Sequence, residues 1–383
     1  MEISVNKNSF PDFYEAGMKS ISYKDLLVKL FLFFLPFSQA LTINIIFPLK
    51  FSEIFLFLLL LHECVSGNIL KWRLSKPILL ILIFSFLVFI SVVINIFYKY
   101  NYSLSDEYAR ISPAIDSVLK FFYVLIAIIA LIVTRNVLTE NPKLIRWFFI
   151  GAIISSLYAW YLFVSGVLHL PTFLLPGMDA DPQKINISIG DIIRCGTFKE
   201  GNYMGFFLLI SAIVAIYNKK SLLAVFFFAT ILTTFSTTSI FCSIIFLMFY
   251  LMKRYKKYKG KLIAGICATA FLIMLLVQFS DAFRTIFYNK LFANEDSVEN
   301  ANDLYSKADR LNTTMVGLNI FVNNPVLGIG LANYGLHYNH YNELPELDLV
   351  DETKRIPNDI YVEILSECGS LSFIVFLVFL YNL

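Results

Sequence analysis

Three arginines beside glycine-containing segments have the residue types and spacing best suited to chemistry in this chain. Arg194 lies in the segment Ile193–Tyr203, IRCGTFKEGNY, a few residues before an apolar stretch. Arg310 begins a helix-like segment that ends in the turn sequence NNPVLGIG, and Arg355 precedes the last apolar stretch. A charge beside a membrane span is costly unless it faces a cavity or a partner. These arginines are therefore candidate functional residues, the alternative being side chains that are solvated or paired with an acid, such as Asp309 beside Arg310.

Other catalytic signatures are missing from the sequence. It contains no Walker loop, no dinucleotide fingerprint, no HExxH and no Ser–His–Asp spacing, so we expect no cofactor and no nucleotide-driven pumping. Five cysteines show no metal-ligand spacing, so no metal site is expected. Cys195 and Cys368 would lie near an outer face, where a disulfide is chemically allowed. The favoured interpretation is that both are small apolar residues.

The composition decides the class of protein. Of 383 residues, 58% are hydrophobic, only 15% are charged and 39 are phenylalanine, whereas an ordinary soluble domain has about 25% charged residues. A folded surface in water needs more polar cover than this chain supplies. A soluble enzyme, a nucleic-acid-binding protein and a disordered chain are therefore excluded. The sequence predicts an all-α polytopic integral membrane protein whose surroundings are a lipid bilayer, with no nucleic acid as partner.

Apolar stretches predict about ten transmembrane helices. The stretches are Leu26–Phe47, Phe51–Cys64, Ile78–Phe97, Val118–Val133, Trp147–Leu168, Asn202–Tyr217, Leu222–Thr233, Thr237–Met252, Leu262–Phe279 and Ile364–Leu383. Apart from Lys29, Glu53, Glu63 and Glu367, they are interpreted as nearly charge-free.

Basic residues orient these stretches. Lys and Arg gather after the even-numbered stretches, most densely at Lys253–Lys261, so those loops and both termini are predicted to be cytoplasmic. Residues 1–23 form a polar cytoplasmic segment without the apolar core of a signal peptide. Residues 24–279 hold helices one to nine and an outer loop at 171–200, residues 280–363 form a large outer loop, and residues 364–383 form the final helix.

The large outer loop is acidic and is predicted to be folded. Between Asp281 and Glu363 there are six Lys/Arg against thirteen Asp/Glu, although the whole chain carries a net charge of +3. Ala308–Val322 has a helix-like pattern, and turn residues follow it at Asn324–Pro325 and Gly328–Gly330. A folded outer loop of this length usually carries function.

The three segments, in this order, resemble the O-antigen polymerase and O-antigen ligase superfamily of bacterial envelope proteins. The corresponding residues are RCGTF at Arg194–Phe198, Arg310 at the head of the loop helix, PVLGIG at Pro325–Gly330, and the closing motif from Pro357–Asn358 to ECG at Glu367–Gly369. The resemblance covers the chain from about Trp147 to the end.

The resemblance implies a GT-C-like fold and glycosyl transfer on the periplasmic face of the bacterial inner membrane. The donor would be an oligosaccharide linked through diphosphate to a polyprenol, so no nucleotide is needed. The family assigns Arg194 and Arg310 as catalytic residues that neutralise the leaving diphosphate, which is the main electrostatic demand of this reaction. A chain-length regulator and a flippase of the same pathway are the implied partners.

Five further residues are candidates for binding substrate: Arg284, Arg355, Glu367, Tyr334 and Tyr338. Glu367 is interpreted either as a helix-end charge reaching for water or as a site carboxylate. The two tyrosines are candidate sugar-stacking rings, although ordinary packing is the favoured interpretation.

One departure from the family separates its two branches. The ligase branch has a histidine before the asparagine of the closing motif, where this chain has Pro357, so the polymerase branch is favoured. His337 and His340 are alternative histidines, with a surface role favoured. The general base stays open among four carboxylates, namely Glu200, Asp359, Glu363 and Glu367. A second departure is the end at Leu383, where relatives commonly continue, as expected of a short variant or a truncated chain.

Three other functions stay open on the sequence. The first is a ligase that transfers finished glycan to a different acceptor. The second is a transporter or flippase of lipid-linked sugars, which the lack of an internal repeat and the few charges in the apolar stretches make less favoured. The third is a structural partner in envelope assembly.

Overall fold

The computed structural model describes residues 23–44, 48–67, 75–97, 112–187, 190–254, 260, 298–343 and 355–382. Most of these residues are helical, and the strands within them form two short antiparallel hairpins. The predicted stretch at Leu262–Phe279 and the candidate Arg284 lie outside the described residues. The prediction of a helical protein is confirmed for the described part of the chain.

The described helices and strands follow one another in this order. They are α1 (Tyr23–Phe34), β1 (Thr42–Asn44), β2 (Pro48–Lys50), α2 (Phe51–Val65), α3 (Lys76–Ile96), α5 (Pro113–Glu140), a 3₁₀ turn (Pro142–Leu144), α6 (Ile145–Val167), β3 (Lys184–Ile187), β4 (Gly190–Ile193), α7 (Gly201–Tyr217), α8 (Ser221–Thr233), α9 (Thr237–Arg254), α13 (Val298–Asn323), α14 (Tyr334–Tyr341) and α15 (Ile360–Tyr381).

Five described helical segments are long and apolar enough to cross a bilayer. They are α3, α5, α6 together with its preceding 3₁₀ turn, α9 and α15. The apolar helices α7 and α8 are shorter, at about 26 Å and 20 Å for a rise of about 1.5 Å per residue. These helices support a multi-pass membrane protein, and the count of about ten spans stays a prediction.

The two ends of the predicted membrane region differ in detail from the expected stretches. Leu26–Phe47 is not one helix, because α1 ends at Phe34 and Pro36 follows, which lacks the N–H that a continuing helix needs. The last helix begins at Ile360 rather than Ile364 and bends at Gly369, whose φ of 76° is not helical.

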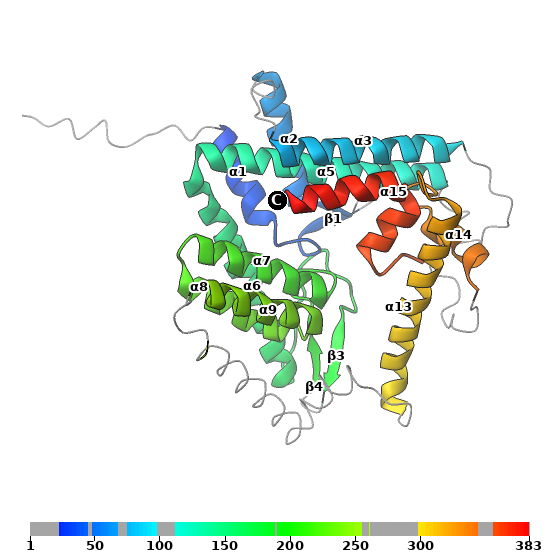
Figure 1. Ribbon diagram of the computed structural model, residues 1–383. Coiled ribbons are helices and arrows are strands. Elements are labelled where there is room, and N and C mark those ends of the chain that lie inside the picture. Colours follow the sequence, from blue (N-terminus) through cyan, green and yellow to red (C-terminus); the bar gives the residue numbers. More distant parts are fainter. Residues whose placement is uncertain are drawn as a thin grey trace, which may run out of the picture.

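The helices pack into two groups. In the first, α1 contacts α2 and α6, and α7 contacts α8, around a core that includes Leu59, Phe149 and Phe227. In the second, α3 contacts α5 and α15, with Ile78 and Val88 in the core. Figure 1 shows α3, α5 and the last part of α15 running alongside one another, while α13 runs across their direction.

Segment 298–343, called the loop unit because the sequence predicts it to be part of a large outer loop, has a small core of its own. Val316 and Ile320 of α13 pack with Ile329 and with the rings of Tyr334 and Tyr338 from α14. The predicted helix over Ala308–Val322 is confirmed, because it lies within α13. The helix ends at Asn323, directly before the Asn324–Pro325 turn. This unit contacts the first turns of α15, so the loop is attached to the membrane region.

Candidate functional site

Arg194 lies in the short connection between strand β4 and helix α7, and its backbone is fixed there. Its N–H donates to the carbonyl of Gln183 at 3.1 Å, and the Gln183 side-chain carbonyl accepts from the N–H of Gly201 at 2.9 Å. Gly196 between them has a φ of 57°, a left-handed conformation that glycine adopts without a Cβ penalty. One glutamine therefore ties the arginine to the first residue of α7.

The Arg194 guanidinium is buried without an acidic hydrogen-bond partner. The residue is only 9% exposed, and Nη2 donates to the Asn202 side-chain carbonyl at 3.3 Å. Nε is buried and has no hydrogen-bond partner among the described residues. Burial lowers the pKa of Arg194, which the charge of Glu200 partly offsets. Because buried donors are nearly always satisfied, an unfilled guanidinium N–H is suited to an anion supplied from outside.

Helix α7 adds to the positive electrostatic potential around Arg194. It begins at Gly201, next to Arg194, and a helix N-terminus carries partial positive charge and unpaired N–H groups. A Cβ at Gly201 would lie 2.6 Å from Arg194 Nε and 2.8 Å from the Thr234 carbonyl oxygen. Only glycine lets the guanidinium pack this closely against the helix start. The arginine and the helix end therefore form one positive site.

Arg310 has a different environment on α13. It is exposed, and its side chain has no partner among the described residues. Its neighbour Asp309 forms an ion pair with Arg355 instead. The Arg355 guanidinium also lies over the Tyr338 ring, 5.5 Å from the centroid. Arg355 therefore holds the loop unit together, whereas Arg310 remains available to a substrate.

Tyr334 and Tyr338 are core residues of the loop unit. Each is 1% exposed, and their ring centroids lie 5.9 Å apart. The Tyr334 hydroxyl donates to the Thr313 carbonyl at 2.5 Å, and the Tyr338 hydroxyl accepts from the Asn312 side chain at 2.9 Å. Burial raises the pKa of Tyr334. The structure supports packing rather than sugar stacking for these two rings, because their faces are covered.

His337 is also buried on α14. Its ring lies 6.1 Å from that of Tyr341, and burial together with the charge of His340 lowers its pKa to about 4. An imidazole with that pKa is a weak base at neutral pH. The surface role expected for His337 is therefore wrong, because its side chain is packed inside the loop unit.

The glycine turn and the closing motif form a single structural unit. Ile329 N–H donates to the Ser366 carbonyl at 3.0 Å, Gly330 N–H donates to the Glu367 carbonyl at 2.9 Å, and Ser370 N–H donates to the Pro325 carbonyl at 2.9 Å. These bonds meet at the bend in α15. Two motif segments that are distant in sequence therefore share one backbone junction.

Two glycines make this junction possible. A Cβ at Gly328, where φ is 66°, would lie 2.4 Å from the Glu367 carbonyl carbon. A Cβ at Gly369, where φ is 76°, would lie 2.3 Å from the Val326 carbonyl oxygen. Both positions need a left-handed conformation and a backbone contact that other residues cannot make. The glycines of the motif are thus structural requirements of the turn.

Glu367 is neither a helix-end charge reaching for water nor an open carboxylate. It is 1% exposed and accepts from the backbone N–H groups of Ala332 at 2.9 Å and Tyr334 at 3.2 Å. Its remaining partner is Lys120 of α5, whose Nζ lies 2.9 Å from Oε2 of Glu367 and 2.5 Å from Oε1 of Glu363. All these partners occupy the carboxylate, so it anchors the segment after the turn.

Lys120 is a residue that sequence reasoning missed. The stretch Val118–Val133 is not charge-free, because Lys120 is its third residue. The signal in the sequence is a positive charge inside an apolar stretch, because such a charge requires a partner. The partners, Glu363 and Glu367, are one helical turn apart on α15.

The Arg194 segment and the closing motif face a common region. Tyr203, in the first turn of α7, is about half exposed and interacts electrostatically with both Glu200 and Glu363. Within the described ranges, no hydrogen bond or ion pair joins Arg194 to α13 or α15. Among the described residues, Tyr203 therefore relates the two motif segments through electrostatics alone.

One cavity belongs to this region. It measures about 460 Å³ and lies between α3, α5 and α15. Leu331 of the turn segment and the charged residues Lys120, Glu363 and Glu367 contribute to its wall, and the other lining side chains are apolar. The charged cluster therefore borders an apolar cavity.

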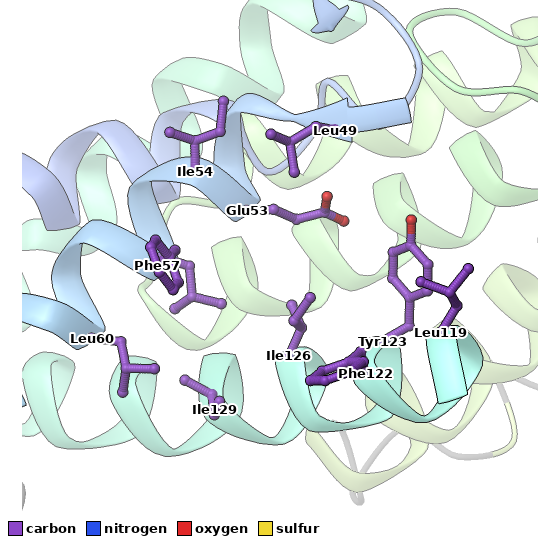
Figure 2. Close-up of a pocket in the computed structure, with 11 residues that line it drawn as sticks. Leu49, Glu53, Ile54, Phe57, Leu60, Leu119, Phe122, Tyr123, Ile126 and Ile129 are labelled. Carbon is purple, nitrogen blue, oxygen red and sulfur yellow. The ribbon is translucent and has the colours of Figure 1, made fainter. Parts of the chain in front are cut away.

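A second cavity, of about 450 Å³, lies between α2 and α5. Figure 2 shows Glu53 and Tyr123 projecting into the space between these helices, among apolar side chains. No residue of the three motif segments lines it. This cavity is therefore separate from the candidate site.

The remaining residues with potential chemistry are metal-binding side chains and cysteine thiols. In the part of the chain that the structure describes, no three His, Cys, Asp or Glu side chains are grouped to hold a metal ion. Cys195 and Cys368 are both buried free thiols, in agreement with the favoured apolar role. Burial raises the pKa of Cys195 to about 11, so this thiol is protonated at neutral pH.

Comparison with known protein families agrees with this arrangement. Residues 222–377 match the model of the O-antigen ligase family. Over these residues the chain is similar to the O-antigen ligase family. The matched region contains Arg310, the Pro325–Gly330 turn and the closing motif, so the predicted resemblance to the polymerase and ligase superfamily is confirmed. A search of curated proteins gives no match.

The match to the O-antigen ligase family supports coarse statements about function. Members of the family are glycosyltransferase-like enzymes, and lipid-linked substrates and a membrane environment fit them. The apolar helices agree with a multi-pass membrane protein of lipopolysaccharide biosynthesis. Arg194 and Lys120 lie outside the matched residues, so their roles rest on the geometry described above.

Proposed function

We propose that the protein is a repeat-unit polymerase of the bacterial inner membrane, with a GT-C-like fold and its active site on the periplasmic face. The donor is an oligosaccharide linked to polyprenyl diphosphate, and the acceptor is a second lipid-linked repeat unit. A hydroxyl oxygen of the acceptor attacks the anomeric carbon of the donor, and the bond from that carbon to the diphosphate oxygen breaks. The polyprenyl diphosphate leaves, and the acceptor proton passes to a base.

The buried Arg194 guanidinium carries this proposal. Negative charge grows on the diphosphate as its bond to the sugar breaks, and preorganised positive groups in a water-poor site stabilise that charge strongly. Arg194 offers an unfilled Nε–H beside the N-terminus of α7. Because the guanidinium is held by Asn202 and packed against Gly201, it needs no reorganisation during the reaction.

Arg310 is the second cation of the proposed site. It is exposed on α13, within the residues that match the O-antigen ligase family, and Asp309 is engaged by Arg355. A flexible exposed arginine suits a group that closes on the diphosphate when the donor binds. The proposed catalytic residues are therefore Arg194 and Arg310.

Four carboxylates are candidates for the base, and their contacts support a choice of one. Glu367 is occupied by Lys120 and two backbone N–H groups. Asp359 caps α15, accepting from Tyr361 N–H at 2.7 Å. Glu363 is also bound by Lys120, whose Nζ lies 2.5 Å from its Oε1, so Glu200 is the proposed base.

The closing motif favours polymerisation over ligation. Pro357 occupies the place of the ligase histidine and has no side-chain group that can accept a proton. The following Asn358 donates to the Thr313 hydroxyl at 3.2 Å and so braces α13. Ligase-type transfer to a different acceptor is the second candidate, because the matched family is described as O-antigen ligase. A chain-length regulator and a flippase are the proposed protein partners.

The proposal is tested with purified protein and polyprenyl-diphosphate glycan extracted from the same bacterium, without nucleotide or added metal. Products are sized by gel electrophoresis and mass spectrometry. A ladder of repeat-unit multiples is expected. One transfer onto lipid A core supplied in parallel, without a ladder, would assign the ligase. Absence of any covalent product from a substrate that a known transferase accepts would contradict glycosyl transfer and favour transport or assembly.

A further inference from the structure

Lys120 connects the membrane helix α5 to the turn of the closing motif. Its Nζ lies between two carboxylates of α15, at 2.5 Å from Glu363 and 2.9 Å from Glu367. Three residues earlier on α5, the Ser117 hydroxyl donates to the Asn333 side-chain carbonyl at 3.2 Å. Because residues three apart lie on the same face of a helix, α5 contacts the motif at two successive points.

Glu367 transmits this contact to the backbone of the turn. Its carboxylate accepts from the N–H groups of Ala332 and Tyr334, directly after the glycine turn. Ala332 has a φ of 68°, which is unusual for a residue with a Cβ. These two hydrogen bonds therefore stabilise the backbone around Ala332 in a left-handed conformation that alanine rarely adopts.

The neighbouring helix α3 holds the other side of the same junction. The Ser91 hydroxyl lies 2.7 Å from the Leu327 carbonyl oxygen and 3.0 Å from the Glu367 carbonyl oxygen. The turn is thus fixed from α3 through its carbonyl groups and from α5 through a carboxylate. Of these supports, the carboxylate depends on a charge, because two glutamates one turn apart repel each other unless a cation lies between them.

We infer that Lys120 is a positioning residue for glycosyl transfer, which keeps Glu367 in place so that the Gly328–Tyr334 segment has the shape needed at the site. The inference rests on the proposed function for its catalytic part. Lys120 does not touch the reacting atoms. It acts through Glu367, and the charge of Glu363 belongs to the same ion cluster.

The chain supplies a matched control in Lys24. Lys24 of α1 also bridges two glutamates, Glu63 at 3.3 Å and Glu140 at 3.2 Å. Glu140 is the last residue of α5, twenty positions from Lys120, or about 30 Å along the helix at about 1.5 Å per residue. Losing Lys24 therefore removes a similar ion cluster without touching the motif.

The experiment compares Lys120→Met, Lys120→Arg and Lys24→Met in the purified full-length protein. Hydrogen exchange of the Ala332 and Tyr334 amides is followed by mass spectrometry, and kcat and KM for polymer formation are measured on the same samples. In Lys120→Met we expect both amides to exchange about tenfold faster or more and kcat to fall at least about tenfold with little change in KM, since removing one partner exposes an uncompensated buried charge. Lys120→Arg should restore both, and Lys24→Met should change neither.

Two outcomes would overturn the inference: unchanged exchange at Ala332 and Tyr334 in Lys120→Met, or faster exchange there with wild-type kcat. If Lys120→Met fails to fold, the neutral double variant Lys120→Met/Glu367→Gln replaces it, and wild-type kcat in that variant would also overturn the inference. A wild-type protein that forms no product would contradict the proposed function instead, whereas the exchange comparison would still decide whether Lys120 holds the turn.

Discussion

Asp309 forms its ion pair with Arg355 and not with the adjacent Arg310. Arg355 and Arg310, which both lie within the residues that match the O-antigen ligase family, therefore have different surroundings. Arg355 is held between Asp309 and the Tyr338 ring, whereas Arg310 is exposed on the same helix as Asp309. This difference leads to separate expectations for the two residues.

Replacing Arg310 should remove activity without affecting folding. In Arg310→Ala we expect polymer formation to fall by at least about a hundredfold, because a cation for the leaving diphosphate is lost. Its thermal midpoint should stay within about 2 °C of wild type, since exposed positions contribute little to stability. Arg310→Lys should keep part of the activity through its charge. The measurement is product sizing beside thermal unfolding in detergent.

Arg355 supplies the comparison for that experiment. Arg355→Ala breaks the ion pair to Asp309 and the contact with Tyr338, so its thermal midpoint should fall more than that of Arg310→Ala. An Arg310→Ala protein that makes wild-type polymer would remove Arg310 from the proposed catalytic residues.

A methyl group at Gly201 should disturb the Arg194 site. It would lie 2.6 Å from Arg194 Nε and 2.8 Å from the Thr234 carbonyl oxygen, closer than real Cβ contacts. Gly201→Ala is therefore expected to lower the rate of polymer formation by about tenfold or more and to destabilise the protein by about 1–3 kcal/mol. Gly260→Ala is the matched control, because a Cβ at Gly260 meets nothing within 4 Å. Equal behaviour of the two variants would contradict the described packing of the guanidinium.

The bend of α15 should depend on Gly369 for two separable reasons. Its φ is 76°, and a Cβ there would lie 2.3 Å from the Val326 carbonyl oxygen. Gly67 has a similar φ of 68° but open space around it. Gly67→Ala should therefore cost only the backbone strain, about 1 kcal/mol, whereas Gly369→Ala should cost more and loosen the glycine turn. Chemical denaturation of both variants measures the difference, and similar losses would argue against the backbone junction.

Removing the Tyr338 hydroxyl distinguishes packing from sugar binding. Tyr338→Phe keeps the ring but loses the hydrogen bond from Asn312, so the free energy of unfolding should fall by about 1–2 kcal/mol, because the buried Asn312 amide is left unsatisfied. The KM for the lipid-linked donor should not change. A raised KM with unaltered stability would restore Tyr338 as a sugar-contacting residue.

Local features of the fold could be predicted from the sequence, whereas contacts between distant segments could not. Periodicity and turn residues predicted the α13 helix and the Asn324–Pro325 turn, because both depend on neighbours in the chain. The same reasoning did not find the contact between Lys120 and Glu367, which depends on α5 packing beside α15. The polar residues around His337 also led to the expectation of a surface side chain, although the rest of the loop unit buries its ring.

The membrane boundaries illustrate a similar limit. Apolar residues continue through Pro36, so hydropathy alone joins α1 to the segment after it, whereas backbone hydrogen bonding ends the helix at Phe34. Likewise, the polar residues at the start of α15 concealed the true beginning of that helix at Ile360. Hydropathy indicates whether a segment prefers lipid or water, whereas the ends of a helix depend on its backbone hydrogen bonds.

In the proposed reaction Arg194 stabilises the leaving diphosphate, so its substitution should reduce the polymer and the released lipid together. Wild type, Arg194→Gln and Arg194→Lys are incubated with purified polyprenyl-diphosphate glycan, and both the polymer and the released polyprenyl diphosphate are quantified. We predict a ladder and released lipid from wild type, at least about a hundredfold less of both from Arg194→Gln, and intermediate amounts from Arg194→Lys. A full ladder from a folded Arg194→Gln protein would contradict the account.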